Sequence, residues 1–174
     1  MFFKIIDKFL SEEDFSEIKS FFIFNKLPWY FNKEDVSIDD NQPLQNKNGF
    51  FYHSIYNNWQ FEGNYPKQLQ NIFLKLNMFA PINIRANLNF RDIDCVASKW
   101  HCDYEGLNSK TAIFYLNTNN GKTLLKINKK IIPVDSIENR MLIFNSEIKH
   151  MSKYQDDVHK RYLININYIE NGNR

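Results

Sequence analysis

Two stretches of this chain alternate between apolar and more polar positions. From residue 82 to 90, isoleucine, alanine, leucine and phenylalanine alternate with Asn83, Arg85, Asn87 and Asn89. Residues 161–169 alternate similarly, and their more polar side consists of Arg161, Leu163, Asn165 and Asn167. Successive side chains of a β-strand point to opposite faces, so both stretches predict strands with one apolar and one polar face.

The first part of the chain shows a helical period instead. Ser11 begins a capping box that ends at Asp14, and the apolar residues behind it follow at helical spacing, which predicts a helix over residues 12–24. Pro66, followed by apolar residues at positions 69, 72, 73 and 76, predicts a second amphipathic helix. Residues 2–6 and 50–56 are expected to be strands, and residues 29–48 a long irregular excursion.

After residue 81 the pattern predicts only strands and turns. The expected strands, besides the two alternating ones, are residues 110–116, 123–127, 131–134 and 140–144. Residues 128–130 join two of them, Asn119-Asn120-Gly121 is a typical hairpin signal, and a loop leads to His150.

Helices followed by short strands indicate an α+β fold. We predict a double-stranded β-helix, or jelly roll, with the N-terminal helices packed on one sheet. We expect residues 1–174 to form a single domain, with helical and irregular support over 1–80 and a jelly-roll core over 81–170.

Composition and charge limit the binding partners and the cellular compartment that we expect for this protein. A formal net charge of +2 gives no strong signal for nucleic acid, and no apolar run approaches the roughly 18 residues of a membrane span. Cys95 and Cys102 are too few for a disulfide framework, which favours reduced thiols in a cytoplasm. We expect Cys102 to be a small core residue.

The residues His101-Cys102-Asp103 are the strongest candidate for chemistry. On an extended segment His101 and Asp103 point the same way and Cys102 the other way. With His150 they would make a set of two histidines and one carboxylate, which is the ligand set of non-haem Fe(II) oxygenases. Of the other histidines, we expect a packing or surface role for His53. His159 lies only two residues before Arg161, on the same expected strand, and we prefer His150 as the ligand.

A cation at the start of the last strand completes the pattern. Arg161 follows His150 by eleven residues, and its planar guanidinium suits a carboxylate held away from water. Taken singly, Arg161 could form a surface salt bridge and His150 could lie in a loop. Their occurrence in this order favours one site.

With these residues in place, the sequence resembles the Fe(II)- and 2-oxoglutarate-dependent dioxygenases of the prolyl-4-hydroxylase-like branch, in particular small members carried by phages. The resemblance covers residues 82–169. It rests on His101-Cys102-Asp103, on the buried run that ends at His150, and on Arg161. It also rests on Tyr115-Leu116-Asn117, which matches the tyrosine that contacts the cosubstrate, and on the polar strand 85–89.

The resemblance implies a function. Fe(II) would be held by His101, Asp103 and His150, and 2-oxoglutarate would reach Arg161 and Tyr115 with its distal carboxylate. Further cosubstrate contacts are expected from Asn87, Asn89 and Asn165. With dioxygen, oxidative decarboxylation of 2-oxoglutarate would be coupled to hydroxylation of a prime substrate. The expected location is the cytoplasm, that of the host if the chain is phage-encoded.

Two other functions fit the same residues. A cupin-like jelly roll would bind metal and perform another reaction or none, although cupins usually offer more histidines. A binding module could have kept the fold and lost turnover. The prime substrate stays open between a protein side chain, a nucleotide and a small metabolite, because residues 29–60 and 104–110, which we expect to contact it, carry no recognisable motif.

Overall fold

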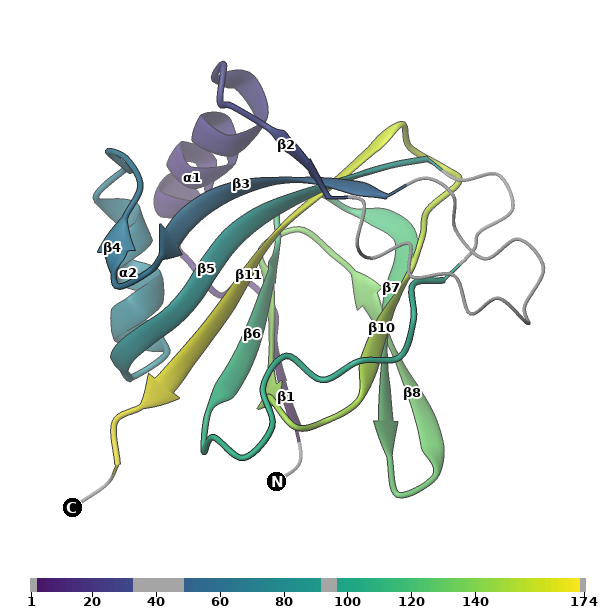
Figure 1. Cartoon of the computed structure of the whole chain (residues 1–174). Coiled ribbons are helices and arrows are strands. Elements are labelled where there is room, and N and C mark those ends of the chain that lie inside the picture. Colours follow the sequence, from purple (N-terminus) through teal and green to yellow (C-terminus); the bar gives the residue numbers. More distant parts are fainter. Residues whose placement is uncertain (1–2, 33–48, 92–96, 173–174) are drawn as a thin grey trace.

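The computed structural model describes residues 3–32, 49–91 and 97–172, which form two antiparallel sheets (Figure 1). The eight-stranded sheet has the order β1 (Phe3–Ile6), β9 (Arg140–Asn145), β6 (Lys110–Tyr115), β11 (Lys160–Glu170), β5 (Met78–Phe90), β3 (Phe50–Asn57) and β2 (Tyr30–Asn32), with β4 (Gln60–Phe61) paired to β3. The three-stranded sheet has the order β10 (His150–Lys153), β7 (Asn119–Ile127) and β8 (Lys130–Ser136). This confirms the predicted jelly roll.

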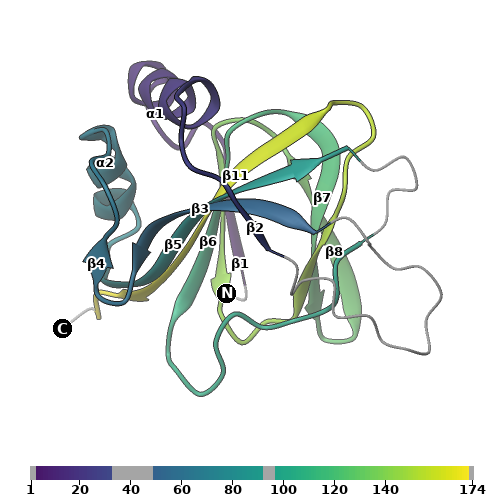
Figure 2. The same cartoon turned by 45° about the horizontal axis from the view of Figure 1, so that its top comes forward.

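Two helices cover the outer face of the large sheet, as the sequence predicted. Helix α1 (Glu12–Phe24) begins at Ser11, whose hydroxyl accepts a hydrogen bond from the Asp14 amide at 3.2 Å. Helix α2 (Gln68–Lys75) lies beside it, and the small sheet lies on the opposite side of the large one (Figure 2). The helices bury their apolar stripes in the core formed with the sheet, through Phe15, Ile18, Phe22, Leu69 and Ile72.

The predicted alternation divides the large sheet into two unlike faces. On the helix side lie the apolar positions of the central strands, among them Ile84, Ala86, Ile164, Ile166 and Phe114. The other positions of the same strands face the small sheet, where a second apolar cluster fills only part of the space. The strand register places Asn165 directly opposite Arg85 and Asn167 opposite Asn83, so the polar positions form one continuous surface.

The hairpin prediction at Asn119-Asn120-Gly121 is wrong, because these residues lie inside β7 and the chain crosses there from the large sheet to the small one. The asparagine side chain satisfies the backbone locally, since the Gly121 amide donates to Asn119 Oδ1 at 3.1 Å. Glycine at position 121 lets the backbone of β7 come close to its neighbours, because a Cβ at this position would lie 3.1 Å from Lys153 O and 3.2 Å from Arg161 Nη1. The hairpin lies instead at Asn128-Lys129, where both residues have positive φ.

Other element predictions were confirmed within a few residues, with two differences. A loop leads to His150 as expected, but His150 begins a strand, β10, that the pattern did not predict. His101 lies in an isolated bridge to His150, not at the end of a regular strand. Most of the expected excursion over 29–48, and Cys95, lie outside the described residues. Within the described ranges, no helix is long and apolar enough to cross a membrane.

Candidate metal centre

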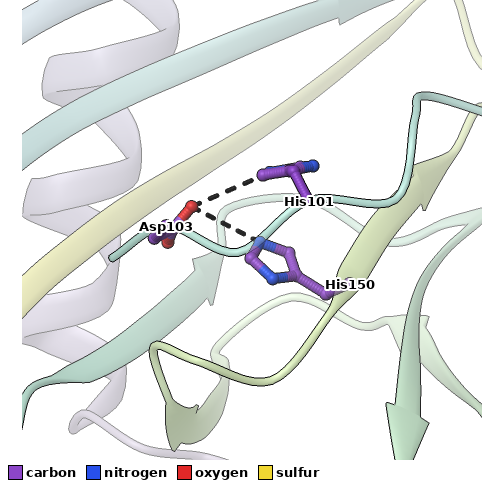
Figure 3. A group of neighbouring side chains, drawn as sticks. All are labelled: His101, Asp103 and His150. Carbon is purple, nitrogen blue, oxygen red and sulfur yellow. Dashed lines mark ion pairs between the residues drawn. The ribbon is translucent and has the colours of Figure 1, made fainter. Parts of the chain in front are cut away.

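Three side chains from two segments meet between the sheets. His101 and Asp103 come from the extended segment after residue 97, and His150 from the start of β10 (Figure 3). Their ligand atoms lie within 4.8 Å of one another. Asp103 Oδ1 is 3.7 Å from His101 Nε2 and 3.5 Å from His150 Nε2. The structure therefore brings together the three residues that the sequence predicted as ligands.

Backbone carbonyls set the orientation of both imidazoles. The segments are joined by paired backbone hydrogen bonds, from His101 N to His150 O at 3.0 Å and from His150 N to His101 O at 2.8 Å. Each ring places Nδ1 near a carbonyl two residues earlier, Lys99 O at 2.9 Å and Ile148 O at 3.1 Å. If Nδ1 donates there, Nε2 presents its lone pair, which is the arrangement usual for metal-binding histidines.

Two polar residues of the large sheet hold the carboxylate. Asp103 Oδ2 accepts hydrogen bonds from Thr111 Oγ1 at 2.9 Å and from Asn167 Nδ2 at 2.6 Å, so Oδ1 alone faces the histidines. Thr111 and Asn167 are buried and also bond to each other. Neither residue had been singled out from the sequence, although the alternation places Asn167 on the polar side of its strand.

Burial and neighbouring groups favour the protonation states in which His150 and Asp103 can bind a metal. Burial lowers the pKa of the His150 imidazole below its ordinary value of 6.5, against the opposing effect of Asp103, so the neutral ring is favoured. Burial by itself would raise the pKa of Asp103, but His150, the hydrogen bonds from Asn167 and Thr111, and His101 together lower it. Two imidazoles and one carboxylate on one side of a centre fit a divalent transition metal with open positions.

A cavity opens beside this group. His101 and His150 line it, and so do all three asparagines predicted to contact a cosubstrate, Asn87, Asn89 and Asn165. The Oδ1 atoms of Asn87 and Asn165 are buried and have no hydrogen-bond partner in the described structure. The cavity thus presents unsatisfied amide groups next to the open side of the histidines, as expected of a binding site and not of a closed core.

Arg161 lies just behind the cavity wall and is completely buried. Its Nη1 donates to Ser152 Oγ at 2.8 Å and to Lys153 O at 3.1 Å, and its Nη2 is 3.5 Å from Thr123 Oγ1. Nε has no partner, and no carboxylate among the described residues forms an ion pair with the guanidinium. A buried cation without a counter-charge is costly unless an anion joins it.

Tyr115 lies beside this guanidinium. The Arg161 Cζ atom is 5.8 Å from the centre of the tyrosine ring, and the Tyr115 hydroxyl donates to Thr123 Oγ1 at 2.7 Å. Burial raises the pKa of this phenol, so it stays a donor. Thr123 and Ser152 line the cavity, whereas Arg161 and Tyr115 stand one layer behind it. Thr123 and Ser152 had not been singled out from the sequence.

The remaining histidines and the described cysteine are not part of the centre. His53 is buried between Pro28 O and the Tyr65 hydroxyl, which confirms a packing role. His159 is exposed. Cys102 is not the core residue we expected: it is partly exposed, and its thiol donates to Glu147 O at 3.1 Å. The reason is that its neighbour His101 pairs with β10 and turns its side chain toward the centre (Figure 3), so that Cys102 faces the other way.

Comparisons with known proteins establish the fold. No family model and no curated protein matches the sequence. Among solved structures, a prolyl hydroxylase from Trichoplax adhaerens, in complex with a peptide fragment of the hypoxia inducible factor oxygen degradation domain, matches 97% of this chain and 83% of its own, with a TM-score of 0.67 and 16% identity.

Two structures of bacterial proteins share the same fold. A prolyl-4-hydroxylase from Pseudomonas putida matches 98% of this chain and 93% of its own, with a TM-score of 0.62 and 12% identity. An oxidoreductase of the 2OG-Fe(II) oxygenase family from Burkholderia pseudomallei matches 99% of this chain and 88% of its own, with a TM-score of 0.69 and 10% identity. The resemblance to phage-encoded members stays a prediction. The chain has the fold of the prolyl hydroxylases and 2OG-Fe(II) oxygenases.

Proposed function

We propose that this protein is a non-haem iron dioxygenase that uses 2-oxoglutarate as cosubstrate and hydroxylates a prime substrate. His101, Asp103 and His150 would hold Fe(II), and Arg161 would bind the distal carboxylate of 2-oxoglutarate. The observation that carries the proposal is the buried Arg161, which has no carboxylate partner among the described residues and lies close to a set of metal-ligand side chains.

The spacing along β10 supports this assignment. Arg161 donates to Ser152, which is two residues from His150 on the same strand. Two residues of a strand span about 6.6 Å. An extended five-carbon chain with C–C bonds of about 1.5 Å spans about 5 Å between its end carbons. A five-carbon dicarboxylate bound at the centre by one end therefore has a suitable length to reach the guanidinium by the other.

Each residue of the site has a distinct role in this proposal. Bound Fe(II), with 2-oxoglutarate and dioxygen, supplies oxidative decarboxylation to succinate and CO2 coupled to C–H hydroxylation. Thr111 and Asn167 hold the Asp103 carboxylate in one rotamer, and the backbone carbonyls do the same for the histidines. Tyr115, whose hydroxyl donates to Thr123 in the described structure, would turn this donor to the carboxylate on Arg161, and Asn87, Asn89 and Asn165 would bind the cosubstrate from the cavity wall. The free thiol of Cys102 suits a reducing cytoplasm.

The alternative is a cupin-like metal protein with another activity or none. It requires a metal at the three ligands and gives no role to a buried guanidinium without a counter-charge. The oxygenase proposal gives Arg161 a ligand, and for that reason we prefer it.

Release of succinate from 2-oxoglutarate, dependent on added Fe(II), tests the proposal. We expect His101→Ala and Asp103→Ala to abolish it, and metal binding measured by calorimetry to fall in parallel. His159→Ala, a change at an exposed histidine outside the centre, is the matched control and should leave both unchanged. Full activity and metal binding in His150→Ala would eliminate this ligand set.

A further inference from the structure

A second cavity adjoins the one at the metal ligands. It is lined by residues of β2, β3, β5 and their ends, namely Phe31, Asn32, Tyr52, Ser54, Asn57, Asn83 and Arg85. We call it the outer groove. Arg85 lines both the outer groove and the cavity of the centre, so its side chain lies at their junction. A molecule in the outer groove that extends past Arg85 would reach the metal ligands.

Arg85 lies close to the centre by strand register. It stands directly opposite Asn165 on β11 and opposite Ser54 on β3. Directly opposed residues of an antiparallel pair have Cβ atoms about 4.5–5.5 Å apart. Asn165 is two residues from Asn167, which holds Asp103. Arg85 is therefore on the same polar surface as Asn167, one strand away from it.

The guanidinium of Arg85 has no polar partner in the described part of the chain. It is half-buried, with its Cζ atom 5.3 Å from the ring centre of Phe50, and forms no hydrogen bond or ion pair with a described residue. Arg161 is equally without a counter-charge, but it lies behind the wall and serves the cosubstrate in our proposal. Arg85 is the cation that the two cavities share.

The other described groups of the outer groove are neutral. They offer amides, hydroxyls and aromatic rings, and no aspartate, glutamate or lysine lines it among the described residues. The amides of Asn83 and Asn57 are only loosely paired, at 3.5 Å. One cation in neutral surroundings suits one anionic group. A nucleic-acid strand carries a charge at every nucleotide and is normally bound by several cations.

We propose that the outer groove holds the prime substrate, that this substrate is a small molecule, and that Arg85 binds its carboxylate or phosphate group. This proposal rests on the proposed function. The anionic group on Arg85 would anchor the substrate beside the centre, while the amides and rings of the outer groove bind its uncharged part. Arg85 is then a specificity-determining residue.

The test uses matched pairs of probes that differ only in charge. The full-length protein, loaded with Fe(II) and 2-oxoglutarate without oxygen to prevent turnover, is titrated by calorimetry. One series compares the common L-amino acids with their carboxamides, and the other compares ribonucleoside monophosphates with their nucleosides. We expect at least one anionic probe to bind about tenfold or more tightly than its neutral partner. The two series distinguish a carboxylate from a phosphate.

Arg85→Gln should remove this difference, and Arg85→Lys should keep part of it. Arg91→Gln, the same change at an exposed arginine just beyond β5, is the matched control and should keep all of it. A difference that survives in Arg85→Gln, or no preference for any anionic probe, overturns the proposal. So does an Arg85→Gln variant whose affinity falls only for 2-oxoglutarate. Failure of the wild type to bind 2-oxoglutarate with Fe(II) would instead reject the proposed function.

Discussion

The two faces of the large sheet are built from the same strands and differ in almost everything else. Toward the helices, β5 and β11 present Ile84, Ala86, Ile164 and Ile166, all nearly or completely buried in one apolar core. Toward the small sheet they present polar side chains, several with unsatisfied atoms. The helix-side face holds the larger apolar core of the fold, while the other face leaves polar groups unpaired that a ligand can satisfy.

The largest expected effect is on the helix face. Phe114 is completely buried, with its ring centre 5.9 Å from those of Phe9 and Phe15. We expect Phe114→Ala to lower the free energy of unfolding by about 3–5 kcal/mol, because it leaves a cavity in a closed core. Urea denaturation measures it. Ile113→Ala, at the neighbouring residue that lines the open cavity, should cost less. Equal losses of unfolding free energy in the two variants would show that the cavity face is packed as tightly as the helix face.

On the other face the expected effect is on ligand binding. Arg161→Met removes a buried charge and should weaken 2-oxoglutarate binding by on the order of 2–5 kcal/mol. The stability of the ligand-free protein should stay equal or rise, since the cation has no counter-charge there. Calorimetry and urea denaturation measure the two quantities. Arg140→Met is the matched control, because Arg140 pairs with Asp7 at 2.5 Å on the surface. Unchanged 2-oxoglutarate affinity in Arg161→Met would reject its assignment.

A smaller effect is expected for a residue that positions a ligand. Asn167→Ala removes the 2.6 Å hydrogen bond to Asp103 Oδ2 and frees the carboxylate to rotate. Loss of such a partner typically lowers metal affinity about 10–100-fold. Titration with Mn(II) or Fe(II) measures this, and Asn83→Ala, a change on the same polar surface outside the centre, should leave metal affinity unchanged. Equal affinities in the two variants would show that Thr111 alone positions the carboxylate.

Replacement of Tyr115 tests whether this residue stabilises the fold, binds 2-oxoglutarate, or does both. Tyr115→Phe removes the buried hydrogen bond to Thr123, and we expect 2-oxoglutarate binding to weaken by on the order of 1.5 kcal/mol. Combined with Arg161→Met, it should cost less than the sum of the two changes, because both groups would contact one carboxylate. A loss of thermal stability without any loss of affinity would make Tyr115 a structural residue only.

The smallest expected effect is a change in the stability of the ligand-free protein with pH. The folded state lowers the pKa of His150 below 6.5, so the unfolded chain takes up a proton on this ring at a higher pH than the folded chain does. The ligand-free protein should therefore lose stability as pH falls from 6.5 toward the lower folded pKa. Urea midpoints measured across this range should show the decline, and His150→Gln should make it shallower. A flat profile in the wild type would contradict the shift.

Periodicity predicted the two faces because it is a local property. Alternation over 82–90 and 161–169 was enough to assign sides, and the helices followed from their spacing and from Ser11. The positions of His101, Asp103 and His150 were also predictable, because the resemblance fixes their order along the chain. That they meet within 4.8 Å is a property of the fold.

What sequence could not predict depends on contacts between distant residues. The bond from Asn167 to Asp103 joins residues 64 positions apart, and nothing near Asn167 in the chain distinguishes it from Asn165. The crossing at residues 119–121 was read as a hairpin because a local turn signal cannot reveal that the chain leaves the large sheet for the small one at this point. The strand at His150 forms only because β7 lies beside it.

Gly121 shows how far the constraint of the site extends into the rest of the chain. It touches no ligand in our proposal, yet a methyl group there would press on Arg161 Nη1 and on the carbonyl of Lys153 that accepts from it. Even alanine, the smallest possible replacement, would place its Cβ 2.8 Å from Asn119 Oδ1, which would have to move, and the guanidinium and the strand would have to shift by a few tenths of an ångström. In a survey of natural or engineered variants, position 121 should therefore tolerate substitution as poorly as a ligand position does, for a purely steric reason.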